Sequence, residues 1–180
     1  MKYIKEKTIV NPDYKVNFFS MLFSSGLFVG YIPKASGTFG SLFGLLFFLI
    51  PGFIESSVLI PVIVVVFIIG VFVSHQMIKR YGDDPSVVVI DEIVGMWITV
   101  LILSSLFEII GNDLKIISAL VAFLTFRFFD IMKLQPARYF DKLKNGFGIM
   151  MDDVVAGIYA GIVSYLIISF LINILISTGL

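Results

Sequence analysis

Carboxylate side chains interrupt an otherwise apolar chain at three separate places. The three groups are Asp91 with Glu92, Asp130 with Arg127, and Asp152 with Asp153. The 180-residue chain is 58% hydrophobic and its mean hydropathy is +1.02, so these charges stand out. Each group lies where a long apolar run meets a polar segment that carries Lys or Arg. Because a carboxylate at membrane depth is costly, such residues usually mark a functional site. We therefore predict one site at one surface of a membrane.

The acids of these groups are candidate ligands of a metal ion. Carboxylates that are brought together repel one another unless a cation or a shared proton holds them. Oxygen ligands without any cysteine, and with a single histidine in the chain, suit Mg²⁺ or Mn²⁺ better than zinc or copper. Mg²⁺ is usually held by one or two carboxylates together with substrate phosphate oxygens, which favours a phosphorylated substrate. The alternative is that the acids only end helices at the lipid headgroups. The predicted ligands are Asp91, Glu92, Asp130, Asp152 and Asp153.

Arg127 and Asp130 are three residues apart and share one face of a predicted helix, which Lys133 follows. They could form a simple ion pair. In a catalytic site, Arg127 would offer a planar fork to phosphate oxygens and Lys133 a point charge, while Asp130 would bind metal or act on water. His75 is a lesser catalytic candidate, because a lone histidine near an interface is more often a plain hydrogen-bonding residue.

The segment 32–41 resembles an anion-binding loop. It contains Lys34, Thr38 and Ser41, with glycines that allow close backbone approach, and it leads into a predicted helix. Backbone N–H groups and the dipole at a helix N-terminus bind anions. Helix capping and a tight turn would explain the same residues.

Long apolar runs predict the fold class. About 20 helical residues are needed to cross a bilayer core. Runs of this order cover 58–78, 93–110, 116–132 and 154–177, and a shorter one covers 42–54. We predict an all-α, polytopic membrane helical bundle with about four to five transmembrane helices. A short interfacial or re-entrant helix would lie within 18–30. Residues 1–180 would form one domain, with 1–17 as a polar cytoplasmic N-terminus.

The distribution of Lys and Arg predicts the orientation in the membrane, because short loops rich in these residues stay in the cytoplasm. If the spans alternate, twelve of the 13 basic residues fall on one side and only Lys115 falls on the other. The twelve are Lys2, Lys5, Lys7, Lys15, Lys34, Lys79, Arg80, Arg127, Lys133, Arg138, Lys142 and Lys144. All three acid groups then face the cytoplasm.

Composition narrows the function further. The formal net charge is zero and there is no basic stripe, which argues against nucleic acid as a partner. Without cysteine there is no thiolate nucleophile and no disulfide. Small residues at four-residue spacing, as in Gly40/Gly44 and Gly157/Gly161, are best explained by helix packing in lipid. A homo-oligomer is compatible with the sequence.

Five motifs follow one another in the chain. They are Gly-Thr-Phe-Gly-Ser-Leu at 37–42, Ser-His-Gln at 74–76, Asp-Glu-Ile-Val-Gly-Met-Trp-Ile-Thr at 91–99, Phe-Arg-Phe-Phe-Asp-Ile-Met-Lys at 126–133 and Gly-Phe-Gly-Ile-Met-Met-Asp-Asp-Val-Val-Ala-Gly at 146–157. In this order and spacing the chain resembles the phosphatidylglycerophosphatase A family over about residues 30–160. The resemblance implies a Mg²⁺-dependent phosphatase of the bacterial inner membrane that converts phosphatidylglycerophosphate to phosphatidylglycerol and inorganic phosphate. The chain departs from the family pattern at Ser36 and Leu134, where prolines are usual, and at Asn145, where a glycine is usual.

Together, the residues and the resemblance predict metal-assisted hydrolysis of a phosphomonoester at the headgroup layer. The five acids would hold Mg²⁺, Arg127 and Lys133 would bind the transferred phosphoryl group, and Lys34, Thr38 and Ser41 would hold headgroup oxygens. Attack by water and attack by Asp130, through an aspartyl-phosphate, both stay open.

A small membrane transporter or ion-binding protein is the alternative function. Such a protein would use the acid cluster as an ion pathway. It would usually place its charged residues near the middle of the bilayer.

Overall fold

The structure is a computed structural model, and it describes residues 10–83, 85–107 and 109–178. Within these ranges the chain is all-helical and contains no strand, which confirms the all-α part of the prediction. Residues 1–9 of the predicted N-terminal segment 1–17, with Lys2, Lys5 and Lys7, lie outside the described residues.

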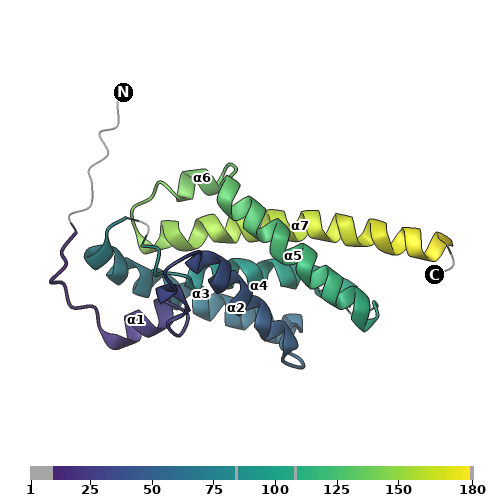
Figure 1. Cartoon of the computed structure of the whole chain (residues 1–180), viewed down its shortest axis with the longest axis horizontal. Helices are drawn as coiled ribbons and strands as arrows, with labels where there is room; N and C mark the ends of the chain where they lie inside the picture. Colours follow the sequence, from purple (N-terminus) through teal and green to yellow (C-terminus); the bar gives the residue numbers. More distant parts are fainter. Residues whose placement is uncertain (1–9, 84, 108, 179–180) are drawn as a thin grey trace.

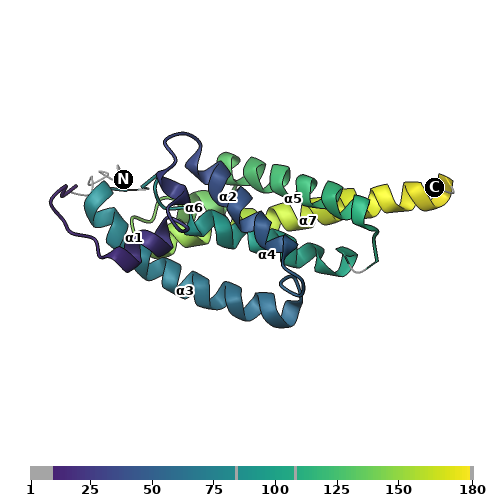
Figure 2. The same ribbon diagram turned by 60° about the horizontal axis from the view of Figure 1, so that its bottom comes forward.

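The helices form an elongated bundle with α7 along its full length (Figures 1 and 2). In chain order the α-helices are α1 (Phe18–Ser24), α2 (Ser36–Leu46), α3 (Ser56–Tyr81), α4 (Ile90–Phe107), α5 (Asn112–Met132), α6 (Ala137–Phe140) and α7 (Gly146–Thr178). Two short 3₁₀ helices, η1 (Val29–Tyr31) and η2 (Phe47–Leu49), follow α1 and α2.

Among the described residues, three helices are long and apolar enough to cross a membrane: α3, α4 and α7, of 26, 18 and 33 residues. They correspond to the predicted spans 58–78, 93–110 and 154–177. The predicted spans 116–132 and 42–54 fall on α5 and on the shorter apolar helix Ser36–Leu49. The predicted number of four to five spans is therefore not confirmed.

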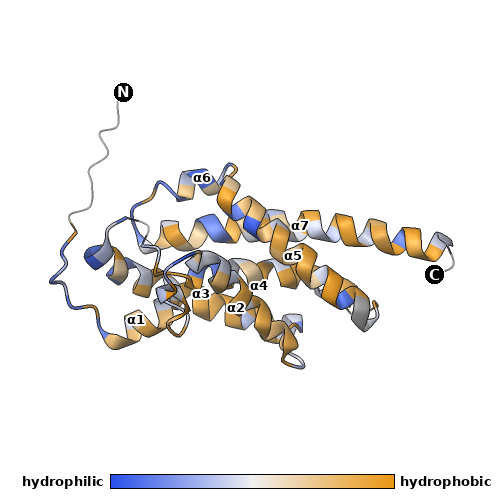
Figure 3. Ribbon diagram, viewed as in Figure 1, coloured by the Kyte–Doolittle hydropathy of each residue, from blue (hydrophilic) through white to orange (hydrophobic). Residues whose placement is uncertain are grey.

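The helix α4 is the centre of the bundle. In the apolar stretch of α4, 67% of the residues are buried. In that of α3 only 11% are buried, so most of α3 faces outward. Because α4 packs against α2, α3, α5 and α7, its N-terminal residues are surrounded by the ends of the other helices. Figure 3 shows the polar residues gathered toward the end of the bundle that holds α6 and the start of α7.

Glycines allow α4 and α7 to approach closely. A Cβ atom at Gly157 would lie 2.4 Å from the carbonyl oxygen of Gly95, so a side chain cannot fit there. The hydroxyl of Thr99 donates to the carbonyl oxygen of Gly157 at 3.2 Å across the same contact. The structure thus confirms that the small residues of α7 serve helix packing. One turn before Gly157, the contact also brings Asp153 to the first turn of α4.

The predicted short N-terminal helix is present as α1. The side chain of Asn17 caps it by accepting a hydrogen bond from the backbone N–H of Ser20 at 2.7 Å. Beyond α1 the chain turns at Gly26, whose φ of +55° is a left-handed conformation that favours glycine. The backbone N–H of Val89 donates to the carbonyl oxygen of Ser24, which joins α1 to the segment before α4. Its interfacial or re-entrant position stays a prediction.

Candidate active site

A cavity of about 380 Å³ lies where several helix ends meet. Its walls come from the starts of α2, α4 and α7, the ends of α3 and α5, and the segments that precede α4 and follow α6. Its charged lining consists of seven acids and three bases: Asp83, Asp91, Glu92, Asp130, Asp141, Asp152, Asp153, Arg127, Lys133 and Lys144. All three acid groups that are distant in the sequence thus meet in one cavity.

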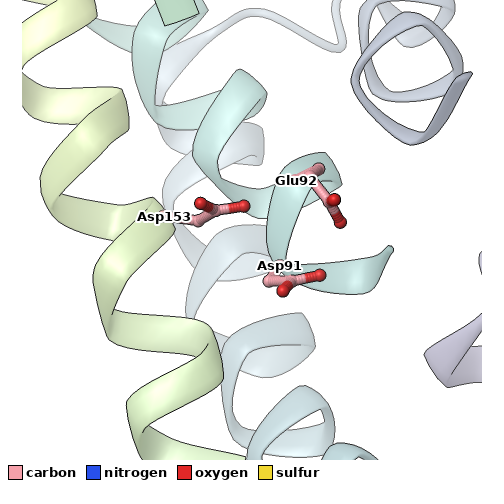
Figure 4. Close-up of side chains that lie close together, drawn as sticks. All are labelled: Asp91, Glu92 and Asp153. Carbon is pink, nitrogen blue, oxygen red and sulfur yellow. The ribbon is translucent and has the colours of Figure 1, made fainter. Parts of the chain in front are cut away.

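Three of these acids, which we call the converging acids, are Asp91, Glu92 and Asp153. Each offers one carboxylate oxygen, and these oxygens lie within 4.8 Å of one another. Figure 4 shows the three side chains, two from the first turn of α4 and one from α7. Asp153 is 3% exposed, and Glu92 Oε2 is buried without a hydrogen-bond partner among the described residues. Clustered oxygen ligands with an unsatisfied buried atom fit a small hard cation such as Mg²⁺.

Three other acids, the paired acids, are Asp130, Asp141 and Asp152, and each contacts a basic side chain. The Oδ2 atom of Asp130 lies 2.5 Å from Nη1 of Arg127, one turn earlier on α5. Lys133 Nζ contacts Asp141 Oδ1 and lies 2.9 Å from Asp152 Oδ2. Asp130 and Asp152, both predicted as metal ligands, therefore share the cavity with the converging acids but lie in ion pairs.

The start of α2 positions Arg127. The hydroxyl of Ser41 accepts a hydrogen bond from Arg127 Nη1 at 3.3 Å and donates to the carbonyl oxygen of Gly37 at 2.8 Å. A Cβ atom at Gly37 would lie 2.3 Å from Glu92 Oε1 and 3.1 Å from Arg127 Nη1. A side chain at position 37 would therefore displace the carboxylate of Glu92 from its present position.

The backbone turn after α5 directs Lys133 into the cavity. Lys133 is the C-cap of α5 and has a φ of 44°, a left-handed conformation. Its backbone N–H donates to the carbonyl oxygen of Phe129, which ends the helix. The ammonium then reaches Asp152 on α7, so one lysine connects two helices.

The other predicted site residues lie outside the cavity lining. Ser41 is fully buried behind Arg127, so its side chain supports the arginine. Lys34 is exposed and Thr38 half-buried, and neither lines the cavity, whereas their neighbours Ser36 and Gly37 do. His75 is exposed on α3 and is also absent from the lining. The roles predicted for Lys34, Thr38 and His75 stay predictions.

Sequence reasoning did not identify Asp83, Asp141 and Lys144 as site residues, although all three line the cavity. Lys144 Nζ lies 2.7 Å from Asp83 Oδ2, which connects the segment after α3 to the segment before α7. The sequence pattern gave little indication of a role for these three residues, because charged residues are common in polar segments between helices.

Two of the departures from the family pattern, Ser36 and Asn145, have local roles. Ser36 donates a hydrogen bond from its hydroxyl to the carbonyl oxygen of Ser86 at 2.6 Å, which holds two walls of the cavity together. The side chain of Asn145 accepts from the backbone N–H of Gly148 at 2.8 Å and caps the start of α7.

The fold and the site together define a class: an all-helical protein with helices long and apolar enough to cross a membrane, and with an acid-lined cavity at one end of these helices. Comparison with known proteins agrees with this class. The profile of the phosphatidylglycerophosphatase A family matches residues 22–168. The chain belongs to this family and is a phosphatase, a phosphoric monoester hydrolase.

Individual relatives match over most of their length. The chain is 37% identical over 168 residues to a phosphatidylglycerophosphatase A of Haemophilus influenzae, covering 91% of this chain and 93% of the relative. It is 35% identical over 165 residues to a protein of the same name from Escherichia coli, covering 91% of each. A Bacteroides thetaiotaomicron protein with the provisional name phosphatidylinositol-3-phosphatase is 34% identical over 149 residues, covering 80% of this chain and 90% of the relative. No solved structure gives a significant match to the chain.

Proposed function

We propose that the protein hydrolyses phosphatidylglycerophosphate to phosphatidylglycerol and inorganic phosphate, with Mg²⁺, at the cytoplasmic face of a bacterial inner membrane. Two relatives that carry the name phosphatidylglycerophosphatase A match 91% of the chain, which supports this substrate. The cavity volume of about 380 Å³ is at the low end for ligand sites, which commonly span about 300–1,000 Å³. A cavity of this size suits a phosphorylated headgroup better than a whole phospholipid.

The balance of charge in the cavity carries the proposal. Its seven acids outnumber its three bases, so an anionic phosphomonoester would be repelled from the cavity as it stands. The three bases, moreover, lie in ion pairs with Asp130, Asp152, Asp141 and Asp83. A divalent cation beside the converging acids would reduce this repulsion and place a positive charge where the phosphate would bind.

The converging acids Asp91, Glu92 and Asp153 would hold that Mg²⁺, and the paired acids Asp130 and Asp152 lie in the same cavity as further ligands. When bound, the ion would neutralise phosphate charge and lower the pKa of a coordinated water.

Arg127 and Lys133 would bind the phosphoryl oxygens. The guanidinium is held by Asp130 and Ser41, so its fork is oriented before the substrate arrives. Phosphoryl transfer mainly needs positioning and electrostatic stabilisation of a loose transition state, and preorganised cations supply both. Asp130 would keep Arg127 in place, and it is the candidate to act on the attacking water.

The depth of the charged groups favours a phosphatase over a transporter. The cavity lies at helix ends and opens beside the polar segments, whereas transporters bind near the middle of the bilayer. Among the described basic residues, Lys115, near the start of α5, is the one that lies toward the end of the bundle opposite the cavity. This asymmetry of positive charge supports a cavity that faces the cytoplasm. In this topology, α5 and the combined segment α2–η2 would cross the membrane in addition to α3, α4 and α7, which gives four to five crossings.

Phosphate release from defined lipids tests the substrate. Purified protein in detergent micelles with Mg²⁺ should release phosphate from phosphatidylglycerophosphate at least about tenfold faster than from phosphatidylinositol 3-phosphate, since a site built for one headgroup discriminates by about 1–3 kcal/mol. Faster release from phosphatidylinositol 3-phosphate would instead assign to this protein the activity for which the Bacteroides relative is named. Absence of phosphate release from both would refute the proposal.

Cysteine labelling tests the orientation, and the chain contains no native cysteine that would have to be removed. Lys142, which is exposed, and Gly111, which has open space around it, suit single replacements by cysteine. A membrane-impermeant maleimide should reach position 142 only from the cytoplasm and position 111 only from the other side. Labelling of both from one side would contradict the proposed topology.

A further inference from the structure

Asp141 is a cavity residue that neither the motifs nor the proposed mechanism includes. It directly follows α6, and its backbone N–H donates to the carbonyl oxygen of Ala137 at 2.9 Å. Its carboxylate contacts the ammonium of Lys133, which also bonds to Asp152 on α7. Asp141 thus holds, from a separate segment, one of the two cations that the mechanism needs.

The exposed fractions distinguish the two carboxylates that share Lys133. The side chain of Asp152 is 8% exposed, whereas those of Asp141 and Lys133 are 34% and 29% exposed. A buried carboxylate beside an ammonium would draw a flexible lysine inward and away from the open part of the cavity. A second carboxylate on the open side opposes this pull and keeps the ammonium at the wall where a phosphate would arrive.

The segment that carries Asp141 is itself held firmly. The hydroxyl of Tyr159 on α7 donates to the carbonyl oxygen of Gln135 at 2.6 Å. A Cβ atom at Gly148 would lie 2.4 Å from the carbonyl oxygen of Leu143 and 2.7 Å from that of Phe140, so this part of the segment packs directly on the backbone of α7. The position of Asp141 relative to Lys133 is therefore set by the fold.

We propose that Asp141 is a positioning residue for phosphate hydrolysis, which acts by holding Lys133 between itself and Asp152. The inference rests on the proposed function, because it assumes that Lys133 binds the substrate phosphate. Asp141 touches no reacting atom in this arrangement and acts only through the lysine.

A double-mutant cycle tests the proposal. Asp141→Asn should lower kcat/KM for phosphatidylglycerophosphate about tenfold, as expected for one lost charge-assisted hydrogen bond. Asp141→Glu should recover most of that loss. In a Lys133→Gln background, Asp141→Asn should have no further effect, because the lysine on which it acts is gone. Lys142→Gln, on the exposed neighbouring residue, is the matched control.

Stabilisation by inorganic phosphate gives a second measurement that does not depend on turnover. With Mg²⁺ present, phosphate should raise Tm of the parent. Asp141→Asn and Lys133→Gln should each reduce this rise, and Asp141→Asn should not reduce it further in the Lys133→Gln background. Additive losses, or an unchanged or higher kcat/KM in Asp141→Asn, would overturn the positioning role. Failure of the proposed function alone would appear differently, as a parent that binds phosphate without hydrolysing phosphatidylglycerophosphate.

Discussion

The converging acids and the paired acids occupy one cavity, yet the fold gives them different surroundings. Asp91, Glu92 and Asp153 lie where α4 and α7 pack closely, and one carboxylate oxygen of each lies within 4.8 Å of the others. Asp130, Asp141 and Asp152 lie beside the end of α5, within reach of Arg127 or Lys133. The chain compensates the paired acids with its own cations, while a metal ion would compensate the converging acids in the proposed mechanism. The same residue type thus serves two purposes, decided by its neighbours.

The largest expected effect comes from the converging acids. Removal of Mg²⁺ with EDTA, or the substitution Asp153→Asn, should lower kcat/KM by about 10³-fold or more, because a bound metal ion contributes several kcal/mol of transition-state stabilisation. Phosphate release measured across a Mg²⁺ titration checks both. Glu55→Gln, on an exposed residue far from the cavity, should behave as the parent.

The Mg²⁺ titration also tests the division into two groups. Asp153→Asn should raise the Mg²⁺ concentration needed for half-maximal activity much more than Asp130→Asn does. Equal shifts for the two variants would show that the converging and the paired acids form a single metal site.

The next largest effect is expected at Arg127. Arg127→Lys keeps the charge but loses the fork that can donate two parallel hydrogen bonds to phosphate. We expect kcat and kcat/KM to fall together by about 10²-fold, equivalent to about 3 kcal/mol. Steady-state kinetics and thermal stability of the same sample check this, with Arg138→Lys as the control on an exposed arginine. A destabilised variant with full activity would make Arg127 a structural residue.

A smaller effect is expected at Gly37. This residue lies in the first turn of α2, next to the side chains of Glu92 and Arg127. In Gly37→Ala the new Cβ would meet Glu92 Oε1 at 2.3 Å, so the carboxylate has to move while the fold remains. We expect about a tenfold loss of kcat, since a displacement of about 1 Å at a site can cost up to 10²-fold. Gly111→Ala, with nothing within 4 Å of its Cβ, is the control for a glycine replacement. Unchanged kinetics would mean that Glu92 needs no fixed position.

The smallest effect is expected at Ser41. Ser41→Ala removes a long hydrogen bond of 3.3 Å to Arg127, and a net contribution of about 0.5–1 kcal/mol predicts a loss of about two- to fivefold in kcat/KM. Ser118→Ala, at a buried serine nearer the other end of α5, controls for the loss of a buried hydroxyl. In an Arg127→Lys background the effect of Ser41→Ala should disappear. A large loss that persists there would instead place Ser41 in direct contact with substrate.

The sequence by itself determined the class, the apolar helices and most of the charged site. Long apolar runs predict helices because a backbone in lipid has to satisfy its hydrogen bonds internally. The runs 58–78 and 154–177 lie within α3 and α7, and the run 93–110 is helical up to Phe107, where α4 ends. Acids at the ends of such runs have few other uses, which is why Asp91, Glu92, Asp130, Asp152 and Asp153 are all found in one cavity.

Only the tertiary structure decided which acids converge and which ones pair. That choice depends on the close contact of Gly95 with Gly157, which brings Asp153 to α4, and on the left-handed backbone at Lys133, which turns its ammonium toward Asp141 and Asp152. It also showed that Ser41 is buried and accepts a hydrogen bond from Arg127, a contact that the sequence did not predict. Distances between residues far apart in the chain arise from helix packing, and local residue patterns do not contain them.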